Sequence, residues 1–308
     1  MLSTHGRSRL PLCRIAVAAI VLIVLPVALM MAAAIFLTRP DRTSIGAAPP
    51  DLHARDAAFR SEDGVRLRGW YVEGRRGCGA VLLLHGVHAD RRQMLGRARF
   101  LAAAGYSVLL VDSRAHGESE GDAITFGHLE AVDARAALGY LRRQAPGERA
   151  GIVGVSLGGA AAVLAHPPLR IDALVLEQVY STVAEALVNR LRLHLGSPGP
   201  WLAAPLRAAT SWWLGIDATD LRPVDRIAGI DAPLLVIAGE SDRHTTIAQS
   251  KALFDAAMEP KQFWSVPAAA HVDLQALLGV AYADRVLAFL AAWLRPAADG
   301  IDCPNSTA

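Results

Sequence analysis

Two kinds of hydrophobic pattern follow one another along the chain. A run without any charged residue covers 15–37, and after residue 55 short apolar runs alternate with longer segments whose apolar positions have helical spacing. A bilayer core needs roughly 20 apolar residues to be crossed by a helix. The first pattern therefore predicts a transmembrane helix over 15–37, and the second predicts a domain in which strands and helices alternate.

The strands of this domain begin with a hairpin over 57–71, because Asp63-Gly64 supplies the positive φ angles of a tight turn. The apolar runs that follow have the length and composition of strands buried on both faces: 80–84, 106–111, 150–155, 173–176 and 234–238. The segments between them predict crossover helices: 91–104, 129–144, 157–165, 247–258 and 282–294. We expect an α/β fold with a mostly parallel, doubly wound sheet covered on both faces.

One segment, about 181–221, interrupts the alternation of strands and helices. It is too long for a simple connection and contains Trp201, Trp212 and Trp213. We predict a small helical cap over a pocket. Ordinary packing helices with tryptophans in the core are the alternative.

These patterns divide the chain into five parts. We predict a basic segment at 1–14, the transmembrane helix at 15–37, a linker at 38–54, the α/β domain at 55–295 and a tail at 296–308. The linker is rich in proline, which suits an exposed segment with no core of its own.

The apolar run is longer than the hydrophobic region of about 7 to 15 residues that is usual in a secretory signal. We therefore prefer an uncleaved anchor to a cleaved signal peptide, although Ala32 and Ala34 form an A-x-A pattern. We therefore expect a single-pass membrane protein that is attached to the membrane by this helix.

Arginines flank the apolar run on both sides, at positions 7, 9 and 14 before it and at 39 and 42 after it. The excess before the helix favours an N-terminus in the cytoplasm. The α/β domain is then expected in the periplasm or another extracytoplasmic space.

Charge and composition exclude two classes of protein. Of 308 residues, 53% are hydrophobic, and 31 Lys and Arg oppose 29 Asp and Glu, for a net charge of +2. A nucleic-acid binder would show a dense basic face and a disordered chain low hydrophobicity, so neither is expected. Of the three cysteines, Cys13 borders the apolar run, so within the domain only Cys78 and Cys303 could pair with each other. We favour free thiols over this pair.

The candidate chemistry begins at Gly154-Val155-Ser156-Leu157-Gly158, which follows a predicted strand and opens a predicted helix. This is the context of a nucleophile elbow, a turn so sharp that side chains at Gly154 and Gly158 would clash with other backbone. Ser156 is therefore the candidate nucleophile. The helix N-terminus beside it favours negative charge that develops in a transition state.

A serine nucleophile needs a histidine base and a group that orients the base. His271 follows a predicted strand at 262–266, on a loop at the carboxyl edge of the sheet. Asp242 lies on the loop after the strand 234–238, and Glu240 is its local competitor. We predict Ser156, His271 and Asp242 as a catalytic triad, with backbone amides of Val87 and Leu157 as the oxyanion hole.

With these motifs the chain resembles the α/β-hydrolase superfamily over nearly all of residues 55–295. His85-Gly86 matches the family's His-Gly after the third strand, and the segment from Asp112 to Ser119 matches its Asp-x-Arg-x-His-Gly-x-Ser. The resemblance is strongest to small-capped, membrane-anchored serine hydrolases. It implies no metal and no organic cofactor, and it implies that Arg114 and His116 hold the loop by hydrogen bonds rather than act on substrate.

The resulting hypothesis is a serine hydrolase that cleaves an ester-type bond of a small, apolar acyl substrate through an acyl-serine intermediate. A serine peptidase acting on short peptides is the enzymatic alternative, and a non-catalytic membrane-tethered binding protein is the alternative of another class. A metal-dependent hydrolase would have to use His85 and His88, which no set of carboxylates accompanies. His88 shapes the pocket or lies on the loop surface. The sequence leaves the oligomeric state open.

Overall fold

The sheet is built by eight strands that the chain places in the order β10-β9-β8-β7-β4-β5-β3-β2. The structure is a computed structural model that describes residues 10–295 and 303–304. The predicted basic segment 1–14 and tail 296–308 lie largely outside these residues. The strands are β2 (Arg55–Arg60), β3 (Arg66–Val72), β4 (Ala80–Leu84), β5 (Ser107–Asp112), β7 (Ala150–Val155), β8 (Ala173–Glu177), β9 (Leu234–Gly239) and β10 (Lys261–Val266).

The strands from β10 to β5 pair in parallel, and only β2–β3 and β3–β5 pair antiparallel. The parallel strands β4, β5, β7, β8 and β9 are buried at every residue, because helices cover both faces of a doubly wound sheet. The predicted fold class and the hairpin are confirmed, but the turn spans residues 61–65 and, of Asp63 and Gly64, only Gly64 has a positive φ, of 89°.

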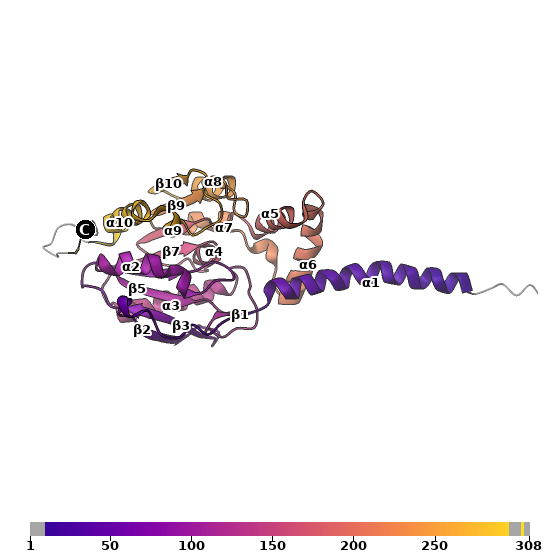
Figure 1. The fold of residues 1–308 in the computed structure, drawn as a ribbon, viewed down its shortest axis with the longest axis horizontal. Helices are drawn as coiled ribbons and strands as arrows, with labels where there is room; N and C mark the ends of the chain where they lie inside the picture. The colour runs from indigo at the N-terminus through magenta and orange to yellow at the C-terminus, as the bar shows by residue number, and fades with distance from the viewer. Residues whose placement is uncertain (1–9, 296–302, 305–308) are drawn as a thin grey trace, which may run out of the picture.

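Two hydrophobic clusters lie on the two faces of this sheet, beneath the helices that cover it. Figure 1 shows the arrangement of the sheet and these helices. One face is covered by α3 (Glu130–Gln144), α4 (Leu157–Leu164) and α8 (Ile247–Ala256), and the other by α2 (Leu95–Ala103) and α10 (Val280–Leu294). Short elements complete the connections: the 3-10 turns η2 (Arg91–Met94) and η5 (Ile227–Gly229), and the helices α7 (Pro223–Arg226) and α9 (Leu274–Leu278). The carboxyl ends of the parallel strands are left free to carry loops.

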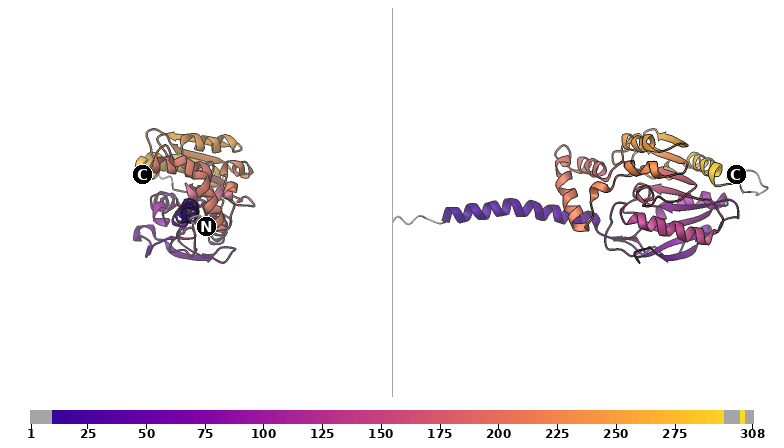
Figure 2. Two further views of the ribbon diagram at one scale, coloured as in Figure 1. Left: turned by 90° about the vertical axis from the view of Figure 1, so that its right-hand side faces the viewer. Right: turned by 180° about the vertical axis from the view of Figure 1, so that it is seen from behind.

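The cap consists of α5 (Val183–Leu195), η3 (Gly199–Leu202), α6 (Ala203–Leu214) and η4 (Ala218–Asp220). It lies at one end of the domain, where the N-terminal helix also emerges (Figures 1 and 2). The three tryptophans of this segment are 85%, 76% and 45% exposed at positions 201, 212 and 213. They are not part of a core, so the alternative expectation of packed core tryptophans is wrong.

The apolar N-terminal segment forms helix α1 (Leu10–Thr38), and its last turns pack on the cap. Ala34 is fully buried in a cluster with Leu206 and Ala209 of α6. Within the described part of the chain, no helix combines the length and the apolar character that a membrane span requires. The predicted transmembrane helix over 15–37 is therefore not supported, and the apolar residues near its C-terminal end have a protein partner instead.

The segment predicted as an exposed linker, 38–54, is also attached to the domain. Its strand β1 (Asp41–Arg42) pairs in parallel with β6 (His116–Gly117), and after it the 3-10 turn η1 (Pro50–Leu52) buries Leu52. The two-residue sheet has no hydrophobic pattern that a sequence could reveal, because backbone hydrogen bonds join its two strands.

Cys78 and Cys303 form a disulfide with a Cα–Cα separation of 5.7 Å. The expectation of free thiols is wrong. The two cysteines are 225 residues apart, so only the folded chain brings them together.

Candidate active site

Ser156 stands between the end of β7 and the start of α4, with a φ of 48° and a ψ of −110°. A positive φ is rare for a residue with a side chain and marks a backbone held by its surroundings. A Cβ added at Gly154 would lie 2.5 Å from the Cα of Gly159, and one added at Gly158 would lie 2.5 Å from the carbonyl oxygen of Leu84. The elbow therefore needs glycine at both flanking positions for the reason that the sequence suggested.

The Ser156 amide is held from the neighbouring strand, because it donates a hydrogen bond of 2.8 Å to the carbonyl of Glu177 at the end of β8. The Glu177 carboxylate is itself fixed by Arg97, whose Nε lies 2.8 Å from it. The same guanidinium reaches Asp273 at 2.9 Å, two residues beyond His271. Arg97 thus ties the nucleophile turn to the loop of the candidate base.

His271 and Asp242 meet at the carboxyl edge of the sheet. His271 Nδ1 lies 2.7 Å from Asp242 Oδ2, and the aspartate is buried while the histidine side chain is 22% exposed. Ser156 and His271 both line the same pocket. Glu240, the local competitor, is exposed and makes only a backbone contact to β10.

The Asp242 carboxylate receives three further hydrogen bonds from its own loop. The amides of His244 and Thr245 donate to Oδ1 at 2.8 and 2.9 Å, and the Thr245 hydroxyl donates to Oδ2 at 2.7 Å. Burial by itself raises the pKa of Asp242, but the hydrogen bonds from His271 and Thr245 outweigh it and lower the pKa below its usual value. Asp242 is therefore ionised at neutral pH and able to orient an imidazole.

Two residues that position Asp242 and His271, Thr245 and Gln178, were missed by the sequence analysis. Thr245 gives no signal in the sequence, because its role depends on where the folded loop places its hydroxyl beside Asp242. Gln178 Nε2 donates to the carbonyl of Ala270 at 2.6 Å and so holds the loop before His271. Gln178 has a φ of 51°, a strained conformation at a strand end for which the sequence gives no signal.

The amides of Val87 and Leu157 are the candidate oxyanion donors. The Val87 amide makes no hydrogen bond to any described residue. Leu157 is the first residue of α4, so its amide has no acceptor within the helix. Both residues line the pocket with Ser156. The two amides are thus available to an oxygen that a substrate brings.

Two buried histidines hold the loop that carries Val87. His85 Nδ1 lies 2.7 Å from the carbonyl of Gly86, and its Nε2 accepts from the Ser113 amide at 3.0 Å. His116 repeats this arrangement, with Nδ1 2.8 Å from the carbonyl of Arg114 and Nε2 3.3 Å from the His88 amide. Each ring therefore donates with one nitrogen and accepts with the other, which only a neutral imidazole can do.

The pKa values of both histidines agree with this geometry. Burial lowers the pKa of His85, and burial together with the nearby His85 lowers that of His116 to about 4. Both nitrogens of His85 are occupied, so the ring has no lone pair for a metal ion. Among the described residues, no group of three or more metal-ligating side chains comes together.

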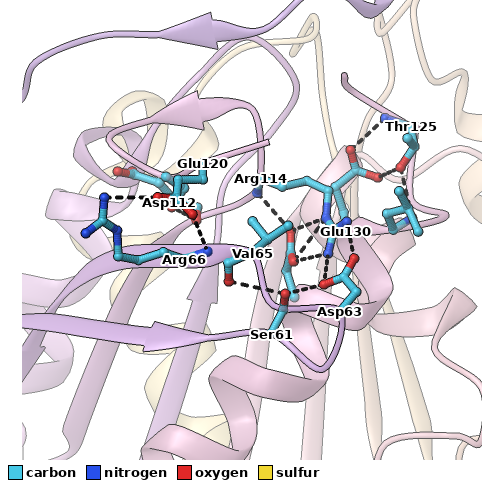
Figure 3. A network of polar contacts seen from close by, with 12 residues as sticks. Ser61, Asp63, Val65, Arg66, Asp112, Arg114, Glu120, Thr125 and Glu130 are labelled. Atoms are coloured by element: carbon cyan, nitrogen blue, oxygen red, sulfur yellow. Dashed lines mark hydrogen bonds and ion pairs between the residues drawn. The ribbon is translucent and has the colours of Figure 1, made fainter. Parts of the chain in front are cut away.

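Arg114 has the structural position that the resemblance implied (Figure 3). Its guanidinium lies 2.7 Å from Asp133 on α3 and 2.7 Å from Asp63 in the first hairpin. In the same view Glu130 accepts hydrogen bonds from the amide and hydroxyl of Thr125, at 2.8 and 2.6 Å. These ion pairs and hydrogen bonds hold loops of the domain, and none of the residues that form them lines the pocket.

The pocket is mostly apolar and lies between the sheet edge and the cap. The domain contributes Val87, Phe126 and Leu157, the cap contributes one face of α5, and α1 contributes Leu37. His88 also lines it, while its Nδ1 lies 3.4 Å from Asp41 of β1. Of the two interpretations of His88, the structure supports the one that places it at the pocket.

Comparisons with known proteins agree with this architecture. A family model described as serine aminopeptidase, S33, matches residues 76–195. An uncharacterized protein of Mycobacterium tuberculosis is 37% identical over 244 residues, which cover 77% of this chain and 79% of that protein. An alpha/beta hydrolase domain-containing protein of Arabidopsis thaliana is 29% identical over 251 residues, covering 76% and 78% of the two chains.

Solved structures show the same fold. An esterase from Pyrococcus furiosus superposes with a TM-score of 0.69 at 24% identity, covering 83% of this chain and 99% of that one. An esterase from a Rhodococcus species superposes with a TM-score of 0.56 at 18% identity, covering 78% and 99%. The fold, the site and these relatives together show that the chain belongs to the α/β-hydrolase superfamily.

Proposed function

We propose that the protein is a serine esterase that transfers an acyl group from an ester to water. Ser156 is the nucleophile, His271 the general base and acid, and Asp242 the group that orients His271. The observation that carries the proposal is the convergence of a strained serine, a histidine hydrogen-bonded to a buried carboxylate and two unused amides on one pocket.

In the proposed reaction the Ser156 hydroxyl attacks the ester carbonyl while His271 Nε2 takes its proton. The amides of Val87 and Leu157 stabilise the negative oxygen of the tetrahedral intermediate. His271 then gives the proton to the leaving alcohol, and the acyl-serine that remains is hydrolysed by a water that His271 deprotonates. The apolar lining favours a substrate with an apolar acyl or alcohol part.

Labelling of the full chain with a fluorophosphonate, followed by peptide mapping, tests this proposal. We expect labelling at Ser156 that is lost in Ser156→Ala and strongly reduced in His271→Ala. His128→Ala is the matched control, because His128 is exposed and outside this pocket. If folded wild-type protein is neither labelled nor active on p-nitrophenyl esters, the proposal is wrong and a binding role takes its place.

A peptidase remains the second candidate because the matching family model describes serine aminopeptidases. An aminopeptidase needs an acidic group to bind the substrate's ammonium. Among the described residues that line the pocket, none is Asp or Glu. We therefore expect esters to be cleaved and aminoacyl p-nitroanilides not, and faster cleavage of the anilides would reverse the order of the two candidates.

We also propose that the domain works outside the reducing cytoplasm. The Cys78–Cys303 disulfide supports this location, since such bonds persist mainly in oxidising compartments. Alkylation of free thiols in intact cells, before and after reduction, tests it. Cys78 that reacts without prior reduction would contradict the proposal.

A further inference from the structure

The face of the cap helix α5 that lines the pocket is apolar except for one charged residue, Arg190. The residues of α5 that line the pocket are Val183, Ala186, Leu187 and Arg190. Their spacing of three, four and seven residues places them on one face of the helix. Arg190 is therefore part of the pocket wall, on the same face as the apolar residues that precede it.

Arg190 is half-buried and, unlike the buried arginines of the domain, has no carboxylate partner among the described residues. Arg91, Arg97 and Arg114 each form an ion pair with a carboxylate. Across the described residues, the Arg190 guanidinium has neither a hydrogen bond to another side chain or carbonyl nor an ion pair. As stated above, the described lining of the pocket holds no carboxylate that could serve.

The surroundings of Arg190 do not compensate for this charge. Burial lowers the pKa of Arg190, and the hydroxyl of neighbouring Tyr180 donates its hydrogen at 3.0 Å to the carbonyl of Phe126, with no hydrogen bond to Arg190 among the described residues. His244, which also lines the pocket, has a buried Nδ1 without a hydrogen-bond partner among the described residues. Arg190 is half-buried, and the partial loss of a cation's hydration without a partner costs free energy. A binding partner that brings negative charge would recover it.

No other ionisable group of the described pocket lining neutralises the charge of Arg190. Arg207 on α6 is the second arginine of the lining, and the carboxylate that feels its charge is Asp217. The remaining ionisable side chains of the described lining are His88, His244 and His271, beside the phenol of Tyr180. The pocket thus combines apolar walls with an excess of positive charge.

We propose that Arg190 binds an anionic group, a carboxylate or a phosphate, that the substrate carries at a distance from its scissile ester. The substrate class is then an apolar ester with a negatively charged end. This inference rests on the proposed esterase function, because it assigns the far end of the substrate whose carbonyl Ser156 attacks. The apolar residues of α5 between the two ends accommodate the carbon chain.

Paired substrates that differ only in charge test the proposal. The first series consists of mono-p-nitrophenyl esters of succinic, adipic and suberic acid, each compared with its neutral methyl ester at the far carboxyl. The second compares the octanoyl ester of 4-hydroxybenzoate with phenyl octanoate, so that the charge lies on the alcohol side. The measured quantity is the ratio of kcat/KM for the anionic substrate to that for the neutral one.

We expect a ratio of about 10 to 100 for the wild type in at least one series, since hydrogen bonds to charged groups are the strong ones. Arg190→Leu should bring that ratio close to one, and Arg190→Lys should retain part of it. Arg192→Ala is the matched control, because Arg192 is exposed on the same helix and outside the lining, and it should leave the ratio unchanged. Because a ratio is compared, any loss of folded enzyme cancels.

A ratio near or below one in both series, or a ratio that Arg190→Leu does not change, would overturn the proposal. Failure of the esterase function has a different signature, since then neither the neutral nor the anionic esters react and Ser156 is not labelled. In that case titration of Ser156→Ala protein with octanoate and with octanol, followed by calorimetry, still decides. Tighter binding of octanoate that is lost in the double variant with Arg190→Leu supports the anion site, and equal binding refutes it.

Discussion

The substitution Gly158→Ala tests the geometry of the nucleophile turn most directly. The added methyl carbon would lie 2.5 Å from the carbonyl oxygen of Leu84 and 2.6 Å from its carbonyl carbon. Ordinary contacts begin at 3.4 Å, so α4 and the end of β4 must separate by about 0.9 Å. Both atoms belong to backbone, which has no rotamer by which to move away.

This separation falls between the two halves of the proposed oxyanion hole. Leu84 is followed by the loop of Val87, and Gly158 is preceded by Leu157 and Ser156. A displacement of about 1 Å in a catalytic group can cost about 10²-fold in rate, and overpacking costs about 1–3 kcal/mol of stability. We expect kcat on p-nitrophenyl esters to fall about 10²-fold and the free energy of unfolding to fall by about 1–3 kcal/mol.

Gly139→Ala is the matched control for this experiment. Gly139 lies within α3, and a Cβ there would meet only the flexible end of Arg143 at 3.6 Å. Replacing glycine by alanine inside a helix should stabilise the protein by about 0.5–1 kcal/mol and leave kcat unchanged. Steady-state kinetics and urea unfolding of both variants provide the data. A Gly158→Ala enzyme with kcat within threefold of wild type and undiminished stability would refute the reasoning.

Three further predictions concern the groups around the site and the disulfide. Asp242→Asn should lower kcat by about 10³ to 10⁴, because the amide cannot stabilise the imidazolium of His271. Thr245→Val should lower kcat only about tenfold, since Asp242 keeps its other hydrogen bonds. Equal losses of kcat in the two variants would contradict this prediction. Burial holds the pKa of His116 at about 4, whereas an exposed histidine has a pKa of about 6.5, so the unfolded chain binds this proton more strongly. The free energy of unfolding should therefore fall by up to about 3 kcal/mol as the pH drops from about 6.5 to about 4. Urea unfolding of a His116→Gln variant across this range should show a shallower slope, and an unchanged slope would refute it. Cys303→Ser should lower the free energy of unfolding by about 2–5 kcal/mol, because the Cys78–Cys303 disulfide closes a loop of more than 200 residues. Unfolding of the wild type with and without reductant checks this prediction. Equal stabilities would show that the disulfide is not formed.

The sequence determined the order of strands and helices because the period of its apolar residues records which face of each element is buried. The runs at 80–84 and 150–155 became β4 and β7 with the same bounds. The glycines around Ser156 revealed a sharp turn because the clash of a Cβ with backbone is local to a few residues. Ser156, Asp242 and His271 could be proposed together because they follow β7, β9 and β10, and a parallel sheet brings the loops after its strands to one edge.

The tertiary structure decided what depends on contacts between distant segments. Thr245 and Gln178 position the triad through hydrogen bonds whose partners no periodicity announces. The pairing of Cys78 with Cys303 needed both ends of the domain to be in place. The same apolar sequence can form a helix that is covered by lipid or one that is covered by protein. Only the tertiary structure showed that Ala34 packs against the cap. Arg190 likewise is one charge among many in the sequence, because its isolation becomes visible only when every neighbour is known.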